Sequence, residues 1–227
     1  MLTVVYRIRF KKGEDVKFIS HLDLMRCMTR SFKRAGINLS HTEGFNPHPK
    51  LSFGLPLPVG VSSDSCYMDV MIEDNMNTED LICKLNHSLP KGLNILQVVT
   101  PEDESSVMSL VAAANYKLVL KPINCSSEVF TDDLQKILDQ DGVYIEKETK
   151  KNTKMVNIKD LIHTFSVSCN TDSGLIEVMC DAGSQNNLNP MLILKAIGQY
   201  SDYRFDLVSV ERTGLYMEKN KNFVPII

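Results

Sequence analysis

The order of the predicted secondary-structure elements constrains the fold of this chain more than any other feature of its sequence. Alternating apolar residues at 4–10 and 67–72 predict strands, and capped stretches with helical periodicity predict helices between and after them. The first half therefore has the order β-α-β-β-α-β, which is the ferredoxin-like arrangement. The same order follows in the second half, without convincing sequence identity between the halves. The sequence predicts an α+β fold of two tandem ferredoxin-like (βαββαβ) units.

The remaining elements follow from the same signals. In the first half we expect a strand at 93–100, and helices at 22–35 and 78–89, the second capped by Thr78; the segments 37–41 and 51–57 flank the GFNPHP loop. In the second half we expect strands at 116–120, 143–148, 164–168, 175–180 and 205–210, a helix at 131–139 capped by Thr131, and a helix at 189–200. Between the halves, PEDESSVMS at 101–109 is acidic and lacks periodicity, which is typical of a linker. We therefore expect domains at 1–104 and 113–227.

Cysteine usage and hydropathy indicate the environment of the protein. The six cysteines form no C-x-x-C pair and show no metal-ligand spacing, so the sequence predicts no bound metal and no cofactor. Charged residues come too early for a secretory signal, and no apolar run of about 18 residues is available to span a bilayer. We expect a cytoplasmic protein that does not contact membranes.

Charge is distributed unevenly along the chain. Residues 1–50 carry ten Lys and Arg against four Asp and Glu, whereas residues 51–115 carry two against nine. A basic start next to an acidic middle suggests one surface that faces a polyanion. A chance cluster on a solvated surface is the alternative.

The helix expected at 22–35 is basic on one side. Ser20 and Asp23 fit a capping box, and Gly36 stands where a C-cap glycine belongs. Helical spacing places four cations in a sector of about 100°, opposite apolar residues that would pack on the sheet: Arg26, Arg30, Lys33 and Arg34. These charges repel one another, and RNA phosphates would compensate them. A solvated helix face is the alternative interpretation.

The loop HTEGFNPHPKLSFG at 41–54 is stiff and carries flat rings. Gly44 permits a positive φ and the two prolines restrict the backbone. Phe45 and His48 offer rings, Asn46 offers an amide, and Lys50 adds a charge. Single-stranded RNA recognition uses this combination of stacking and phosphate contact. A structural connection with Phe45 in the core is the alternative.

These two stretches supply the candidate site residues. We expect RNA contacts from His21, Arg26, Arg30, Lys33, Arg34, Phe45, Asn46, His48 and Lys50. His21 and Asp23 could also be an acid–base pair, but Asp23 already has a capping task. The sequence lacks nucleophile motifs and phosphate-binding loops, so we predict no catalytic residue.

The same stretches resemble a known family. FISHLDLMRCMTRSFKRAG and GFNPHPKLSFGLPLPVGVSS are similar to the hallmark of the radical SAM-linked protein family, DUF2344. The resemblance is dense from Tyr6 to Ile72 and diffuse beyond it. Members occur beside or fused to a radical S-adenosylmethionine enzyme, so the resemblance implies such an enzyme as partner. This chain has no C-x-x-x-C-x-x-C motif, so the iron–sulfur chemistry would belong to that partner.

These observations lead to one functional hypothesis and two rivals. We expect a non-catalytic RNA-binding accessory module that acts with a separate radical SAM enzyme in RNA modification. The first rival is a protein–protein adaptor that docks the enzyme without contacting RNA. The second is a Cas6-like, metal-independent endoribonuclease with His21 or His48 as base, which rests on architecture alone. The sequence lacks the glycine-rich loop that those nucleases carry near their end.

Overall fold

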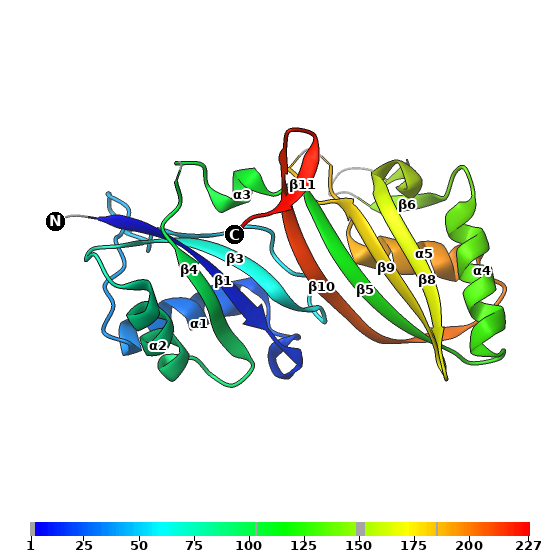
Figure 1. Ribbon diagram of the computed structural model, residues 1–227, viewed down its shortest axis with the longest axis horizontal. Helices are drawn as coiled ribbons and strands as arrows, with labels where there is room; N and C mark the ends of the chain where they lie inside the picture. Colours follow the sequence, from blue (N-terminus) through cyan, green and yellow to red (C-terminus); the bar gives the residue numbers. More distant parts are fainter. Residues whose placement is uncertain (1–2, 103, 149–152, 185) are drawn as a thin grey trace. The chain divides into compact units, whose positions relative to one another are not determined.

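The protein has an α+β fold whose described residues are 3–102, 104–148, 153–184 and 186–227 of a computed structural model. Five α-helices and mostly antiparallel strands lie within these ranges. Contacts between residues divide the chain into two compact units. The first contains Met1–Val111 together with Leu215–Ile227, and the second contains Ala112–Gly214 (Figure 1). The end of the chain thus belongs to the same unit as its beginning.

The first unit contains the element order that the sequence predicts for the first half. Its elements are β1 (Val4–Lys12), a 3₁₀ turn (Glu14–Val16), α1 (His21–Arg34), β2 (Leu51–Phe53), β3 (Ser62–Ile72), α2 (Thr78–Ser88), β4 (Leu93–Val99) and α3 (Val107–Leu110). The strands lie in the order β4-β1-β3-β2, and all neighbours are antiparallel. At the end of the chain, β10 (Phe205–Lys219) pairs through its last residues with β11 (Asn222–Pro225).

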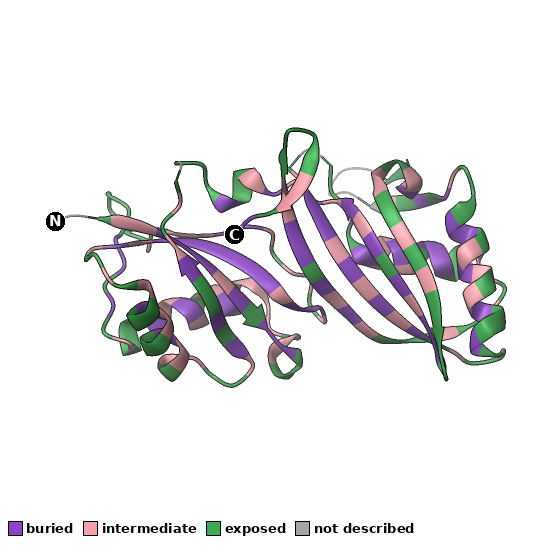
Figure 2. Cartoon of the chain, in the orientation of Figure 1, coloured by how far each residue is buried: buried purple, intermediate pink, exposed green. Residues whose placement is uncertain are grey.

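The core of the first unit lies between its strands and two of its helices. Tyr6, Ile8 and Phe10 alternate along β1 and are buried, because every second side chain of a strand points to the same face. Met28 and Phe32 of α1 join the same cluster, as do apolar residues of α2. Figure 2 shows the resulting alternation of buried and exposed positions along the strands. Each such side chain contributes about 1.5–3 kcal/mol by leaving water.

A buried ion pair ties the end of the expected linker to this unit. The Arg7 guanidinium contacts the Asp69 carboxylate at 2.9 and 3.1 Å, and it also donates to the Ser105 carbonyl oxygen at 2.6 Å. The second carboxylate oxygen of Asp69 accepts from the Val107 backbone N–H at 2.6 Å. Ser106 caps the short helix α3, and the Val107 side chain is fully buried. Within the expected linker at 101–109, Ser105 and Val107 are therefore held against the first unit, and Asp103 lies outside the described residues.

The second unit contains two further helices against its own strands. Its elements are β5 (Ala113–Pro122), α4 (Ser127–Asp139), β6 (Tyr144–Glu148), β7 (Thr153–Asn157), a 3₁₀ turn (Ile158–Leu161), β8 (Ile162–Asn170), β9 (Ser173–Asp181), α5 (Pro190–Tyr200) and the first part of β10. The strand order is β10-β5-β9-β8, and β6 and β7 form a separate antiparallel hairpin. Its core includes Phe130 and Leu134 of α4 and Ile193 and Ile197 of α5.

Several predicted boundaries are wrong, for identifiable reasons. Helix α2 is capped by Asn77, whose side chain accepts from the Glu79 and Asp80 backbone, rather than by Thr78. Helix α4 begins four residues before Thr131, because the Ser126 side chain caps it. The segment 37–41, expected beside the GFNPHP loop, forms isolated bridges at Leu39 and His41. Strand β10 continues nine residues beyond the predicted end at Val210, and β11 follows it.

Candidate nucleic-acid interface

Helix α1 is amphipathic and capped at both ends as the sequence predicts. The Ser20 hydroxyl oxygen accepts from the Asp23 backbone N–H at 3.2 Å, and the hydroxyl donates to the Asp23 carboxylate at 2.7 Å. Gly36 follows the helix with φ of 70°, a conformation that favours glycine. Leu24, Met28 and Phe32 are buried, so the helix is fixed by its apolar face and leaves the opposite face to solvent.

The basic residues of α1 have different surroundings. Arg26 contacts the Asp23 carboxylate at 3.3 Å, with both side chains more than half exposed, so this pair is weak. Arg30 and Lys33 are exposed and form no ion pair with any residue that the structure describes. Arg34 donates to the Ser88 carbonyl oxygen at 2.8 Å and to the Ser31 hydroxyl at 2.7 Å. Arg34 thus links α1 to the end of α2, whereas Arg30 and Lys33 are available to an anion.

The loop between α1 and β2 is closed at its base and open at its tip. The Thr42 backbone N–H donates to the His48 carbonyl oxygen at 2.8 Å, and the His48 N–H donates to the Thr42 hydroxyl at 3.0 Å. These bonds hold the turn at 43–47, in which Gly44 has φ of 116°. Phe45 lies in this turn with a relative exposure of 111 %, so the alternative in which it joins the core is excluded. Asn46 is also exposed.

One hollow brings the helix and the loop together. Its volume is about 430 Å³, and we call it the α1–loop hollow, lined by Met25, Arg26, Thr29, Arg30, His48, Pro49 and Leu51. The Thr29 hydroxyl donates to the Met25 carbonyl oxygen at 2.9 Å, so this hydroxyl is already paired. Most of the surface that lines the hollow is apolar. Arg26, Arg30 and His48, which the sequence singles out on two separate stretches, therefore lie around the same space.

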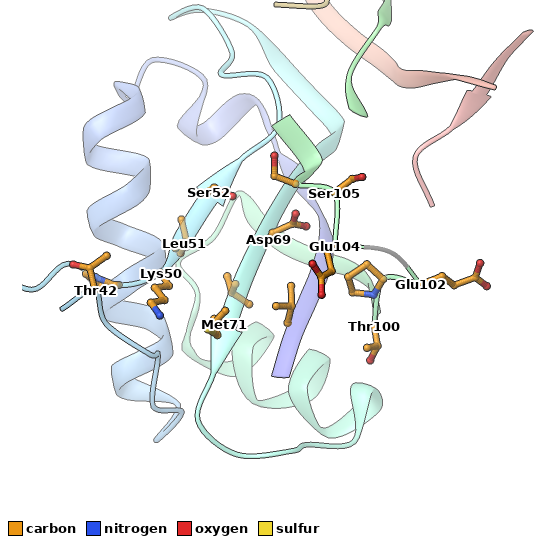
Figure 3. A pocket seen from close by; sticks show the side chains of 15 residues that line it. Thr42, Lys50, Leu51, Ser52, Asp69, Met71, Thr100, Glu102, Glu104 and Ser105 are labelled. Atoms are coloured by element: carbon orange, nitrogen blue, oxygen red, sulfur yellow. The ribbon is translucent and has the colours of Figure 1, made fainter. Parts of the chain in front are cut away.

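A second hollow shares Pro49 and Leu51 with the first. It measures about 760 Å³ and lies between strands β1 to β3 and residues 100–102 and 104–106. Val5 and Met71 contribute apolar surface, and Lys50 and Glu104 lie on opposite sides of it (Figure 3). Asp69 and Glu102 add two further carboxylates, so we call this space the acidic hollow. Sequence reasoning missed it because the stretch that contributes Glu102, Glu104 and their lining neighbours looks like a linker, although its acidic run was the available signal.

His21 has a packing role instead of a place in either hollow. Its ring is half-buried and meets the Phe53 ring edge-on, with centroids 5.0 Å apart and an interplanar angle of 78°. Neither hollow includes it among its lining residues. A contact of this kind stabilises the start of α1 by about 0.5–1.5 kcal/mol beyond area burial. His21 thus packs on Phe53, whereas Arg26, Arg30 and His48 line the α1–loop hollow.

The described residues offer neither a cluster of metal ligands nor, at Cys180, a reactive thiol. Within 3–102, 104–148, 153–184 and 186–227, no group of three or more His, Cys, Asp or Glu side chains could hold a metal ion. Burial raises the pKa of the Cys180 thiol to about 12, with a smaller contribution from Asp181, so this thiol stays protonated at neutral pH. In the same part of the chain, no helix is long and apolar enough to cross a membrane.

Comparison with solved structures gives a distant likeness in fold. A chain of a Cbf5-Nop10-Gar1 complex matches 94 % of this chain at 12 % identity, with a TM-score of 0.51. A chain of an H/ACA ribonucleoprotein bound to a substrate RNA containing 2′-deoxyuridine matches 92 % at 11 % identity, with a TM-score of 0.49. This chain spans about half the length of each. At such identities the first likeness concerns the fold alone, and the second is too weak to argue from.

Comparison with known sequences identifies the family. The chain has no match among curated proteins. A family model described as "Uncharacterized protein conserved in bacteria (DUF2344)" matches residues 5–190, which include α1, the loop and both hollows. The match covers most of the chain, so the protein belongs to the DUF2344 family.

Proposed function

We propose that the protein binds RNA through the α1–loop hollow and the exposed side chains around it, without catalysing a reaction itself. The observation that carries this proposal is the joint lining of one hollow by Arg26, Arg30 and His48 from two elements. Lys33, Phe45 and Asn46 are exposed on the same two elements. Cations supply phosphate contacts and exposed rings supply stacking, which are the two components of RNA binding without a duplex.

The composition of this surface favours a nucleic acid over a protein surface. The fully exposed Phe45 ring adds no burial free energy to folding. A base stacked on such a ring adds about 1–3 kcal/mol to binding. Arg30 and Lys33 repel their neighbours on α1 unless an anion lies near them. His21, Arg34 and Lys50 were predicted as contacts too, but their contacts with Phe53, Ser88 and the acidic hollow favour smaller contributions.

Salt-dependent binding tests this proposal. We expect the substitutions Arg26→Glu, Arg30→Glu and Lys33→Glu together to weaken binding of a fluorescein-labelled single-stranded RNA, measured by anisotropy. The slope of log K against log salt should fall by about 0.7 for each lost phosphate contact, or about 2 in all. The matched control reverses Lys84, Lys136 and Lys219, which are exposed elsewhere and change the net charge equally. Equal losses in both variants would contradict a localised surface.

The partner is a separate part of this proposal. We propose that a radical SAM enzyme acts with the protein in RNA modification in the cytoplasm, which rests on the family resemblance of the signature stretches alone. Affinity capture of the tagged full-length chain from native lysate, followed by mass spectrometry, tests it. A radical SAM enzyme recovered at near-equal amounts would support it. Its absence from captures that retain RNA would remove this partner and keep the RNA proposal.

The acidic hollow favours a second candidate function, that of a protein adaptor. Glu102 and Glu104 beside apolar surface suit a basic segment of a protein partner better than a phosphate backbone. If the triple reversal on α1 leaves RNA affinity unchanged while Glu102→Lys with Glu104→Lys abolishes capture of a protein partner, the adaptor explains the molecule better. The endoribonuclease alternative has no such observation. Incubation of the protein with the labelled RNA would reveal cleavage directly.

Two tandem ferredoxin-like units also remain a proposal for the fold. The β4-β1-β3-β2 order of the first unit and its two helices support it, as does β10-β5-β9-β8 in the second once the β6–β7 hairpin is set aside. The predicted domains, 1–104 and 113–227, can be tested as separate fragments by thermal unfolding. Because Leu215–Ile227 groups with the first unit, we expect 1–104 alone to unfold less cooperatively than a fragment that also carries this segment.

A further inference from the structure

The α1–loop hollow has the volume and the lining residues to hold one flat, apolar-faced group. Its volume of about 430 Å³ falls in the lower part of the range of about 300–1,000 Å³ that small-ligand sites occupy. Met25, Pro49 and Leu51 provide carbon surface, while Arg26 and Arg30 provide charge beside it. A nucleobase in an RNA strand complements this surface: its flat faces are apolar, its edges are polar, and a phosphate lies on each side of its nucleotide.

The hollow is held in place by the loop rather than formed by chance side-chain positions. The two hydrogen bonds between Thr42 and His48 close the loop directly before Pro49, and Pro47 and Pro49 restrict the backbone on either side of the His48 ring. On the opposite wall, Met28 and Phe32 anchor α1 in the core. Both walls are therefore rigid, which lowers the entropy lost when a ligand binds.

The charges beside the hollow distinguish between forms of RNA. A paired and stacked base in a duplex cannot enter a hollow, whereas a base of a single strand can turn out of its stack at a cost of a few kcal/mol or less. Arg30 makes no ion pair with any described residue, and Arg26 has only the weak, exposed contact with Asp23. The phosphates that flank an inserted base can therefore be neutralised without breaking a strong contact of the protein.

We propose that the α1–loop hollow takes one unpaired base of a single-stranded RNA, with its flanking phosphates on Arg26 and Arg30 and a neighbouring base stacked on Phe45. This inference rests on the proposed RNA-binding function and adds the class of RNA that is bound. Thr29 and His48 both line the site, one from the helix and one from the loop. Filling the hollow at Thr29, or removing the ring at His48, should weaken binding of the base.

The experiment compares single-stranded and duplex RNA of equal length on the full chain. Thr29→Phe fills the hollow, and Thr29→Ser is the matched control because it retains the hydroxyl that donates to Met25. We expect Thr29→Phe to weaken single-strand binding about 5- to 150-fold, as the loss of one stacked base predicts, with an unchanged salt slope. Duplex binding should be weak in the wild type and unaffected by the substitution.

A second variant guards against misfolding, and the outcomes separate the two proposals. His48→Ala changes an exposed side chain on the loop, so it tests the same hollow without altering α1; thermal midpoints of all variants establish that they fold. If both variants bind single-stranded RNA like the wild type, or if duplex binds equally well, the base site is wrong while RNA binding stands. If the wild type binds neither RNA, the proposed function itself fails.

Discussion

The α1–loop hollow and the acidic hollow share Pro49 and Leu51, yet they differ in charge and in the elements that form them. Helix α1 and a stiff loop form the first, with Arg26 and Arg30 beside it. Strands and residues 100–102 and 104–106 form the second, and Glu102 and Glu104 are among its lining residues. The basic start and acidic middle of the sequence thus contribute to two separate hollows within one unit. A polyanion is attracted by the first and repelled by the second.

The largest expected effect concerns the ion pair behind the acidic hollow. Asp69→Ala leaves the buried Arg7 guanidinium without its carboxylate and removes the acceptor for the Val107 N–H, so the free energy of unfolding should fall by about 3–5 kcal/mol. Urea unfolding measures this, with Asp74→Ala as an exposed control. Arg7→Met combined with Asp69→Leu should recover part of the loss. A decrease below about 1 kcal/mol for Asp69→Ala would show that this wall does not depend on the pair.

The next effect concerns the loop beside the α1–loop hollow. Phe45→Ala should weaken single-stranded RNA binding by about 1–3 kcal/mol, because one stacked base is lost. Its unfolding free energy should change by less than about 0.5 kcal/mol, since the ring is fully exposed. Phe18→Ala, at another exposed phenyl ring of the same unit, is the matched control in anisotropy titrations. Equal losses at both positions would argue for unspecific adhesion to exposed rings.

A smaller effect separates the two hollows by their cations. Arg30→Ala should lower the salt slope of RNA binding by about 0.7, the value for one phosphate contact on a single strand. Lys50→Ala should leave the slope nearly unchanged, because this side chain lines the acidic hollow opposite Glu104 (Figure 3). The measurement is a salt series for both variants. A lower slope for Lys50→Ala with an unchanged slope for Arg30→Ala would place the RNA phosphates at the acidic hollow.

The smallest effect concerns the carboxylates of the acidic hollow. Glu102→Gln together with Glu104→Gln should change RNA affinity by less than about 0.5 kcal/mol, because salt screens exposed charges that do not contact the RNA. Titrations at physiological ionic strength test this. A large loss of RNA affinity would indicate that the acidic hollow contacts the RNA directly and would remove the contrast between the two hollows.

Local signals in the sequence predicted the ends of α1 better than they predicted several other boundaries of the fold. Ser20, Asp23 and Gly36 define both ends of α1 because capping depends on neighbouring residues. The two stretches that line the α1–loop hollow could be selected from charge and ring content alone. The sequence could not show that both stretches line the same hollow, because this depends on how the loop folds relative to α1.

Long-range partners account for what the sequence did not predict. The acidic stretch at 101–109 looks unstructured, but Ser105 and Val107 find partners in Arg7 and Asp69, about 40 to 100 residues away in the chain. Likewise, β10 extends beyond Val210 and contributes its end to the first unit, where the Leu215 N–H donates to the Ser65 hydroxyl at 3.2 Å. Local sequence patterns do not predict such long-range pairings.

Photo-crosslinking tests the central claim most directly. A single-stranded RNA containing 4-thiouridine is irradiated with the full-length protein, and the crosslinked residues are mapped by mass spectrometry. We predict crosslinks at the hollow and the loop tip, at Met25, Phe45 and His48, which disappear in the Arg26, Arg30 and Lys33 triple reversal. Crosslinks confined to residues 100–106 or to the second unit, at RNA concentrations that saturate binding, would contradict the account.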